Sequence, residues 1–231
     1  MIVYGRQAVA EALRGRRAVH RMWATEPARR AVHAGAVPLE VTSPARIEAL
    51  AGSADHQGVC AETEAYPYGE AADLLSADDA LLVALDEVQD PRNLGAVCRV
   101  AECAGAAGVV IPERRAVEVT PAVCRASAGA VEHLPVARVR NLAEWLETAK
   151  RDGAWVYGAA VEAAVPYERP DYRGRVVLVL GSEGRGLRAR VASNCDELVA
   201  LPVRGRVGSL NVSAAAAALL YGVLHFRAKS P

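Results

Sequence analysis

The chain lacks the features that mark several common classes of protein. None of its 231 residues belong to an apolar run that approaches the ~20 residues of a membrane-spanning helix. Its start, MIVYGRQAVAEAL, has no cationic segment followed by an apolar stretch and a cleavage site, so we expect a cytoplasmic protein that does not meet membranes. A content of 52% hydrophobic and 23% charged residues is typical of globular proteins and excludes the disordered and fibrous classes.

Metal-binding patterns and net charge are also missing. The cysteines contain no C-x-x-C pair and lie far from the histidines, which predicts free thiols and no structural zinc; they are Cys60, Cys98, Cys103, Cys124 and Cys195. The net charge is zero, yet the charges are segregated. Eight arginines face four acids in residues 1–50, seven acids and no base occupy residues 51–80, and nineteen bases face sixteen acids in residues 81–231. The basic N-terminal part offers charge to phosphates, although such surface charge is more often only solvated.

Apolar runs alternate with helical patterns along most of the chain, which indicates an α/β fold with largely parallel sheets. The charge balance shifts sharply in the acidic stretch that ends near residue 80, so we place a domain boundary near residue 75 with a short acidic linker after it. Residues 1–75 then form a small α/β domain. Residues 76–231 form a larger domain, with an open, largely parallel sheet of six strands and helices on both faces.

The expected elements follow from periodicity and from capping residues. In the small domain we expect helices over 5–15 and 44–52 and strands over 19–25, 37–42 and 57–66. In the larger domain we expect strands over 81–88, 108–113, 134–139, 154–161, 176–181 and 197–203.

Several helix starts in the larger domain can be read from single residues. Asn93 should cap a helix from Leu94 to about residue 105, while Thr120 and Asn141 should open two more. The stretch GSLNVSAAAAALLYG at residues 208–222 predicts a helix that begins near Leu210. Its five consecutive alanines leave the surface of the helix without long side chains, which allows other segments to pack closely against it.

Ligands of open parallel sheets bind beyond the carboxyl ends of the strands, so three strand-to-helix loops are candidate sites. The first, DEVQDPRNLGAVCRVAECAG, contains Asn93 and Arg99. As alternatives to a functional role, Asn93 could only cap the helix and Arg99 could only be a solvated surface residue. The second, VVLVLGSEGRGLRA, contains three glycines around Glu183 and mimics a dinucleotide fingerprint. Only one strand and one helix follow it, however, and no G-K-[ST] is present. The third, LPVRGRVGSLNVS, offers arginines to phosphate, and Ser209 and Asn211 to hydrogen bonding or capping.

Together these loops resemble the SpoU family of RNA ribose 2′-O-methyltransferases in the SPOUT superfamily. The resemblance lies in NLGAVCR, LGSEGRGL and LPVRGRVGSLNVSAA, in this order. In addition, VYGRQAVAEAL and HQGVCAE resemble the N-terminal RNA-binding domain of the bacterial large-subunit ribosomal RNA guanosine methyltransferases. The resemblance implies that residues 1–75 bind RNA substrate and that residues 76–231 form a methyltransferase domain with a deep C-terminal trefoil knot. It also implies a homodimer with the alanine helix at the interface, and S-adenosylmethionine as the methyl donor.

The resemblance carries over to single positions. The catalytic and RNA-facing positions match Asn93, Arg99, Glu183, Ser209 and Asn211. The positions that contact the donor, largely through backbone groups, match Gly181, Leu201 and Leu210. The implied reaction is methyl transfer (EC class 2.1.1) to a ribose 2′-hydroxyl, with a guanosine of large-subunit ribosomal RNA as the favoured acceptor and no metal.

Alternative functions stay open at this point. The chain could act on transfer RNA, or it could be a catalytically silent RNA-binding module. An oxidoreductase that uses the glycine loop would need NADP, with Arg204 at its 2′-phosphate. For methyl transfer, Arg99 is a poor base because a guanidinium has a pKa above ~12. We therefore expect it to hold a phosphate and to stabilise the developing alkoxide.

Overall fold

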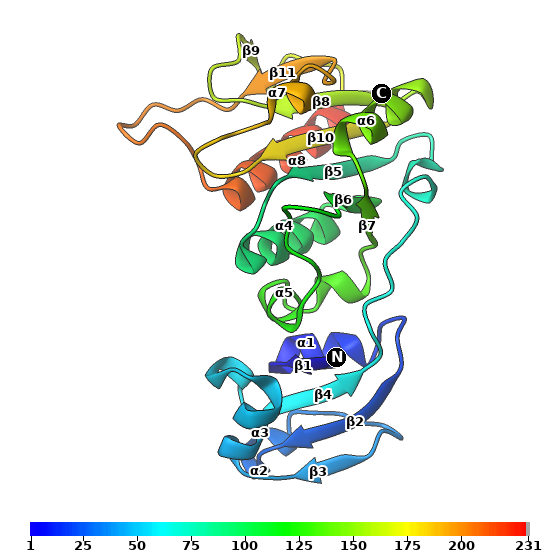
Figure 1. The fold of residues 1–231 in the computed structure, drawn as a ribbon, viewed down its shortest axis with the longest axis vertical. Coiled ribbons are helices and arrows are strands. Elements are labelled where there is room, and N and C mark those ends of the chain that lie inside the picture. Colours follow the sequence, from blue (N-terminus) through cyan, green and yellow to red (C-terminus); the bar gives the residue numbers. More distant parts are fainter. Residues whose placement is uncertain (230–231) are drawn as a thin grey trace.

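The computed structural model describes residues 1–229, which form two β-sheets (Figure 1). The smaller sheet has the strand order β1-β4-β2-β3 and contains β1 (Ile2–Tyr4), β2 (Val19–Ala24), β3 (Leu39–Val41) and β4 (Val59–Thr63). Its helices are α1 (Arg6–Ala12), α2 (Glu26–Arg29) and α3 (Pro44–Ala51), and a 3₁₀ turn covers Ala54–His56. The predicted strands and the two predicted helices are present. Strand β1 and helix α2 were not predicted, because three or four residues are too short to display a period.

The larger sheet is entirely parallel and has seven strands in the order β7-β6-β5-β10-β8-β11-β9. They are β5 (Leu81–Asp86), β6 (Gly108–Pro112), β7 (Val136–Val139), β8 (Trp155–Ala159), β9 (Val165–Pro166), β10 (Val176–Gly181) and β11 (Glu197–Ala200). The six predicted strands are confirmed, and the count of six was wrong by one. The extra strand β9 has only two residues, and it lies at the sheet edge, where a proline is tolerated.

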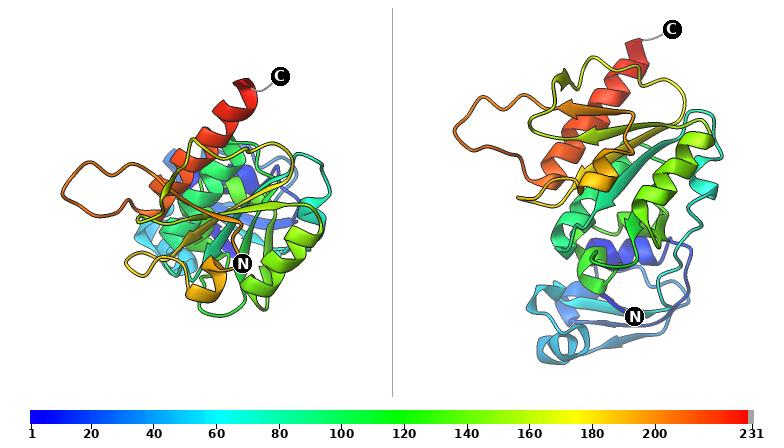
Figure 2. Two further views of the ribbon diagram at one scale, coloured as in Figure 1. Left: turned by 90° about the horizontal axis from the view of Figure 1, so that it is seen from above. Right: turned by 45° about the horizontal axis from the view of Figure 1, so that its top comes forward.

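Helices cover both faces of this sheet because alternate strand residues point to opposite sides. In β5, Leu81, Val83 and Leu85 pack in one core with helices α4, α5 and α8, whereas Leu82 and Ala84 pack in a second core with α6 and α7. The helices are α4 (Pro91–Cys103), α5 (Pro121–Ala126), α6 (Leu142–Arg151), α7 (Ala189–Ala192) and α8 (Val212–Lys229), with 3₁₀ turns at Asp73–Leu75 and Ala130–Glu132. The alanine helix α8 lies against α4 and β10, and residues 202–211 before it form an exposed loop that projects from the domain (Figures 1 and 2).

The helix starts confirm part of the capping analysis. Thr120 and Asn141 cap α5 and α6 as predicted. The prediction for Asn93 was wrong, because the side chain of Asp90 accepts a hydrogen bond from the backbone N–H of Arg92 at 2.8 Å and α4 begins at Pro91. A proline has no N–H and is well placed in the first helical position, so the cap moves to the residue before it. Asn93 therefore lies inside the first turn, with its side-chain amide available for another role.

The two sheets share a continuous hydrophobic core, to which α1 and α5 both contribute. Within it, Arg17 from the small domain donates to Glu132 of the 3₁₀ turn at Ala130–Glu132, with Nε 2.9 Å from Oε2 and Nη2 2.6 Å from Oε1. Only 1% of either side chain is exposed. Burial by itself lowers the pKa of Arg17, but the hydrogen bonds and the charge of Glu132 outweigh it and raise the pKa. The boundary near residue 75 and the trefoil knot stay predictions.

Candidate active site

The glycine loop after β10 closes on itself. The N–H of Gly186 donates to the carbonyl of Ser182 at 2.9 Å. A Cβ atom on Gly181 would lie 2.1 Å from the carbonyl carbon of Gly186, so no side chain fits at Gly181. The sequence therefore needs glycine at this position for a close approach of two backbone segments.

Both ends of this loop are tied to one buried residue, Asp86. Asp86 pairs with Gly181 in the register of β5 and β10. Its fully buried carboxylate accepts the backbone N–H of Arg188 at 2.8 Å and Nε of the same residue at 2.7 Å. The side-chain hydrogen bond to Asp86 raises the pKa of Arg188. Sequence reasoning missed this pair, although an aspartate that ends a fully apolar strand was a usable signal.

Three of the predicted residues meet in one hydrogen-bonded cluster. Nδ2 of Asn93 donates to Oε1 of Glu183 at 2.9 Å, and Nδ2 of Asn211 donates to the same oxygen and to Oδ1 of Asn93, the latter at 3.0 Å. The three residues come from the first turn of α4, the glycine loop and the residue before α8. Because both amides donate to Oε1, Oε2 of Glu183 is left for a ligand.

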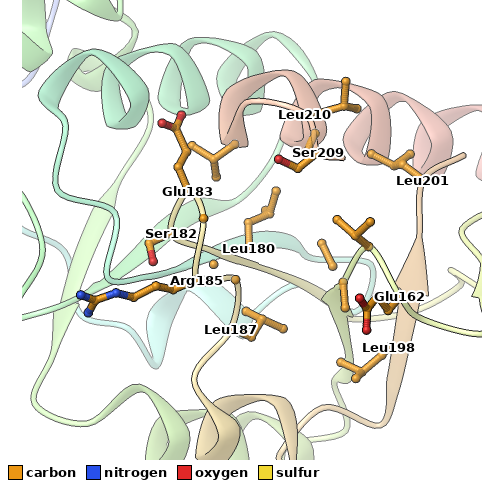
Figure 3. A pocket seen from close by; sticks show the side chains of 18 of the residues that line it. Glu162, Leu180, Ser182, Glu183, Arg185, Leu187, Leu198, Leu201, Ser209 and Leu210 are labelled. Carbon is orange, nitrogen blue, oxygen red and sulfur yellow. The ribbon is translucent and has the colours of Figure 1, made fainter. Parts of the chain in front are cut away.

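A pocket of about 580 Å³ lies beside this cluster, and Figure 3 shows the side chains around it. The backbone of the glycine loop forms one side, and leucine side chains such as Leu180, Leu187 and Leu198 form another. All three predicted donor contacts line it, together with two of the predicted catalytic residues: Gly181, Leu201, Leu210, Glu183 and Ser209. We call this cavity the first pocket.

A second pocket of about 390 Å³ adjoins the first. Its lining comes from the connection between β5 and α4 and from the glycine loop: Glu87, Val88, Gln89, Asp90, Asn93, Ser182, Glu183, Arg185 and Val212. The two pockets share Ser182, Glu183, Arg185 and Val212. A molecule in one pocket would therefore lie next to a molecule in the other.

Arg99 is the predicted residue that does not join this arrangement. It is exposed on α4, lines neither pocket, and has no ion pair or hydrogen bond with another side chain in residues 1–229. It lies six positions after Asn93 in the helix, which is about 9 Å along the axis. Arg204 and Arg206 lie on the projecting loop and also line neither pocket.

Comparison with known proteins then decides the family. Residues 80–221 match the SpoU rRNA methylase family, and residues 2–69 match the domain described as RNA 2′-O ribose methyltransferase substrate binding. The chain belongs to the SpoU family of RNA methyltransferases. This membership confirms the resemblance found in the three loops, and it excludes the oxidoreductase interpretation of the glycine loop.

Several relatives of this SpoU methylase match most of its length. A putative TrmH family tRNA/rRNA methyltransferase of Bacillus subtilis is 38% identical, covering 99% of this chain and 96% of the relative. A 23S rRNA (guanosine-2′-O-)-methyltransferase of Ralstonia nicotianae is 41% identical over 80% of this chain and 76% of its own length. The chain spans 62% of an uncharacterized tRNA/rRNA methyltransferase of Synechocystis, at 37% identity over 98% of this chain. The crystal structure of an AdoMet-bound rRNA methyltransferase from Sinorhizobium meliloti is similar at a TM-score of 0.82 and 28% identity, covering 97% of this chain and 86% of that one.

The structure also bears on membranes, metals and thiols. No helix within residues 1–229 is long and apolar enough to cross a membrane. In the same residues no group of three His, Cys, Asp or Glu side chains could hold a metal ion. All five cysteines are free thiols, and Cys103 is the exposed one.

Proposed function

We propose that this SpoU methylase transfers a methyl group from S-adenosylmethionine to a ribose 2′-hydroxyl, with a guanosine of large-subunit ribosomal RNA as the acceptor. The observation that carries the proposal is the Asn93–Glu183–Asn211 cluster, because its central residue Glu183 lines both pockets. The Sinorhizobium relative binds AdoMet, and the Ralstonia relative is named for a guanosine of 23S rRNA. The place of action that we propose is the cytoplasm.

The residues of the first pocket fit the donor. Its leucines offer apolar surface to an adenine ring, and the backbone around Gly181 allows a ligand to approach closely. Leu201 and Leu210 would close the site over the ligand. The carboxylate of Glu162 suits a cationic sulfonium. When bound, S-adenosylmethionine supplies an already activated methyl group, so the protein has to position the acceptor and assist the departure of one proton.

Glu183 is the residue best placed to act on the acceptor. Its carboxylate points toward α4 and α8 in Figure 3, where Asn93 and Asn211 hold Oε1. Oε2 can then accept a hydrogen bond from a ribose 2′-hydroxyl and orient it. Asn211 also accepts from the backbone N–H of Ser213 at 2.9 Å, which ties the cluster to the start of α8. Ser209 would help to shape the loop around the donor.

Arg99 remains our candidate for a phosphate clamp on RNA that extends beyond the two pockets. It is exposed and unpaired in residues 1–229, so a phosphate can reach it without breaking an existing contact. Arg99→Lys keeps the charge but loses the planar fork, and it tests whether bidentate geometry matters.

The test is single-turnover methyl transfer to ribosomal RNA segments prepared from cells that lack the protein, with mapping of ribose methylation. Glu183→Gln should lower the rate about a hundredfold, comparable to the loss of one catalytic hydrogen-bonding group, while calorimetry shows nearly unchanged donor affinity. Glu147→Gln, on the exposed face of α6, is the matched control. Methylation of transfer RNA alone would redirect the proposal to that substrate. RNA binding with no methyl transfer to either RNA would show a silent binding module.

We also propose a homodimer. One face of α8 packs against α4 and β10 within the chain. A second subunit can therefore contact only the exposed side of α8 and the loop before it, and apolar side chains are exposed on both. Val207 is 76% exposed, Leu210 49% and Tyr221 43%. Light scattering at micromolar concentration should give twice the mass of the chain, and a monomer would contradict the proposal.

We assign RNA binding to the small domain, as its match to substrate-binding domains suggests. Because the two sheets share a core, the test keeps the full chain. Replacing the exposed Arg29 and Arg30 with serine should weaken RNA binding and flatten its salt dependence. Unchanged binding at all salt concentrations would count against the assignment.

A further inference from the structure

We propose that the second pocket receives the base of the acceptor nucleotide and selects guanine through the carboxylate of Glu87, with Arg185 on the phosphate of the same nucleotide. This inference rests on the proposed methyl transfer to RNA. It adds a binding site and a residue that determines specificity.

The chemistry of methyl transfer indicates which part of the acceptor nucleotide the second pocket would hold. The 2′-hydroxyl must lie in line with the methyl group, which places the acceptor ribose at the wall shared by the two pockets. That wall consists of Ser182, Glu183, Arg185 and Val212. The base is attached to the same ribose, so it falls into the neighbouring cavity of about 390 Å³. Unpaired or flipped-out nucleotides present their base edges to proteins in this way.

The polar groups of the second pocket do not suit a phosphate. Glu87, Asp90 and Glu183 bring three carboxylates to the lining, and Arg185 is the single cation among the lining residues. A phosphate inside this cavity would be repelled by the carboxylates, whereas a neutral group that donates hydrogen bonds would be favoured. Nucleobases are neutral, and their Watson–Crick edges carry N–H donors.

Arg185 lies at the edge where the nucleotide backbone would pass. It lines both pockets, and no residue in 1–229 forms an ion pair with it. In Figure 3 its guanidinium extends away from the leucines of the first pocket. An unpaired guanidinium in this place can meet a phosphate of the acceptor strand.

Glu87 is the most buried of these three carboxylates. It follows β5 directly and is only 12% exposed. Oε1 lies 3.3 Å from Nη1 of Arg115 and 3.5 Å from Nη1 of Arg188. A carboxylate has about four lone-pair sites, so these two contacts leave Oε2 free to accept further hydrogen bonds. Asp90, in contrast, already caps α4 and binds the side chain of Arg92.

Among the four bases, guanine matches such a carboxylate best. Its N1–H and its exocyclic N2–H₂ are neighbouring donors on one edge, and a carboxylate accepts both. Adenine and cytosine pair one donor with an acceptor nitrogen on that edge, and uracil places its N3–H between two carbonyl oxygens. An acceptor atom that faces the Glu87 carboxylate is repelled, so the pocket discriminates against these three bases.

The experiment uses the full-length protein and a ribosomal RNA segment whose methylated nucleotide has first been mapped. The acceptor is then changed to inosine, which lacks only the N2 amino group, or to adenosine. With the unaltered protein, inosine should lower kcat/KM about tenfold and adenosine about a hundredfold or more, as expected for one or both hydrogen bonds of a bidentate contact. Donor affinity, measured by calorimetry, should stay constant.

Glu87→Gln supplies the complementary measurement. It should lower kcat/KM for guanosine about ten- to a hundredfold and remove most of the difference between guanosine and inosine. Glu113→Gln, an exposed glutamate after β6, should behave like the unaltered protein. Arg185→Gln should raise KM for RNA on all three substrates to the same extent.

The outcomes separate the two proposals. Equal rates on guanosine, inosine and adenosine, or a mapped acceptor other than guanosine, would overturn the base pocket while leaving ribose methylation intact. Retained discrimination in a folded Glu87→Gln variant would also overturn it. Absence of ribose methylation on every RNA would instead overturn the proposed function. The base substitutions use unaltered protein, so the test survives even if Glu87→Gln does not fold.

Discussion

The buried ion pair between Arg17 and Glu132 predicts that replacing one partner harms the protein far more than replacing both. In the single variant Arg17→Met, the carboxylate of Glu132 stays in a site where 1% of its surface reaches water. An uncompensated buried charge of this kind costs about 3–5 kcal/mol, out of a total stability of about 5–15 kcal/mol. At about 2–4 °C per kcal/mol for a chain of this size, the melting temperature should fall by about 6–20 °C.

The double variant Arg17→Met, Glu132→Leu removes both charges together. Replacing a buried pair by apolar side chains is often neutral, or stabilising by about 1–4 kcal/mol. Here the guanidinium also donates to the carbonyl of Glu64 at 3.1 Å and to Sγ of Cys124 at 3.4 Å, and these contacts are lost. The carbonyl of Glu64 still accepts a hydrogen bond from Oγ1 of Thr63 at 3.0 Å, so each lost contact of the arginine costs only about 0.5–1.5 kcal/mol, which offsets the gain. We therefore expect the double variant to lie within about 2 kcal/mol of the unaltered protein.

Urea unfolding followed by tryptophan fluorescence, with calorimetric melting temperatures, measures the whole cycle. Arg29→Met is the control, because the pair of Arg29 and Glu26 spans 3.6 Å on the surface with side chains 57% and 66% exposed. Such a pair contributes no more than about 0.5 kcal/mol. The reasoning is refuted if Arg17→Met loses less than about 1 kcal/mol, or if the double variant is as unstable as the single one.

Two further predictions concern the glycine loop after β10 and the thiols. Gly181→Ala should lower the affinity for S-adenosylmethionine at least about tenfold in calorimetry, because its Cβ would lie 2.1 Å from the backbone of Gly186. Gly205→Ala, where nothing lies within 4 Å of the new Cβ, should bind normally, and equal affinities would show that the loop adapts. Burial raises the pKa of Cys98 to about 12, whereas Cys103 is exposed. A thiol reagent at pH 8 should therefore label Cys103 rapidly and the buried thiols only after unfolding, and rapid labelling of Cys98 in the folded state would contradict this.

Most of the fold could be predicted from the sequence because its signals are local. The apolar runs of β5 and β10, and the caps at Thr120 and Asn141, depend on residues within a few positions of one another. The same holds for the three motifs that placed the chain in its family. Two residues, Asp90 and Asn93, could each have capped α4. Asp90, the residue before Pro91, is the cap, so the prediction that Asn93 caps this helix failed.

Part of the site was predictable and part was not. The motifs predicted that Asn93, Glu183 and Asn211 belong to one site. They did not predict the hydrogen bonds that join the three residues or the two cavities that Glu183 lines. Arg99 has a motif position as strong as theirs and lies away from both pockets, because the helix that carries it turns its side chain elsewhere.

By itself the sequence determined most of the strands and helices and the family, since each of these depends on period, composition or a short motif. Only the tertiary structure decided that Asp86 holds Arg188 and that Arg17 is buried against Glu132. It also decided that Glu87 lines the second pocket, which adjoins the first. The residues of the two ion pairs are separated by 102 and 115 positions, and many residues of the same type elsewhere in the chain are solvated. An arginine or a carboxylate acquires such a role from the burial and the partners that the fold provides, which no local pattern encodes.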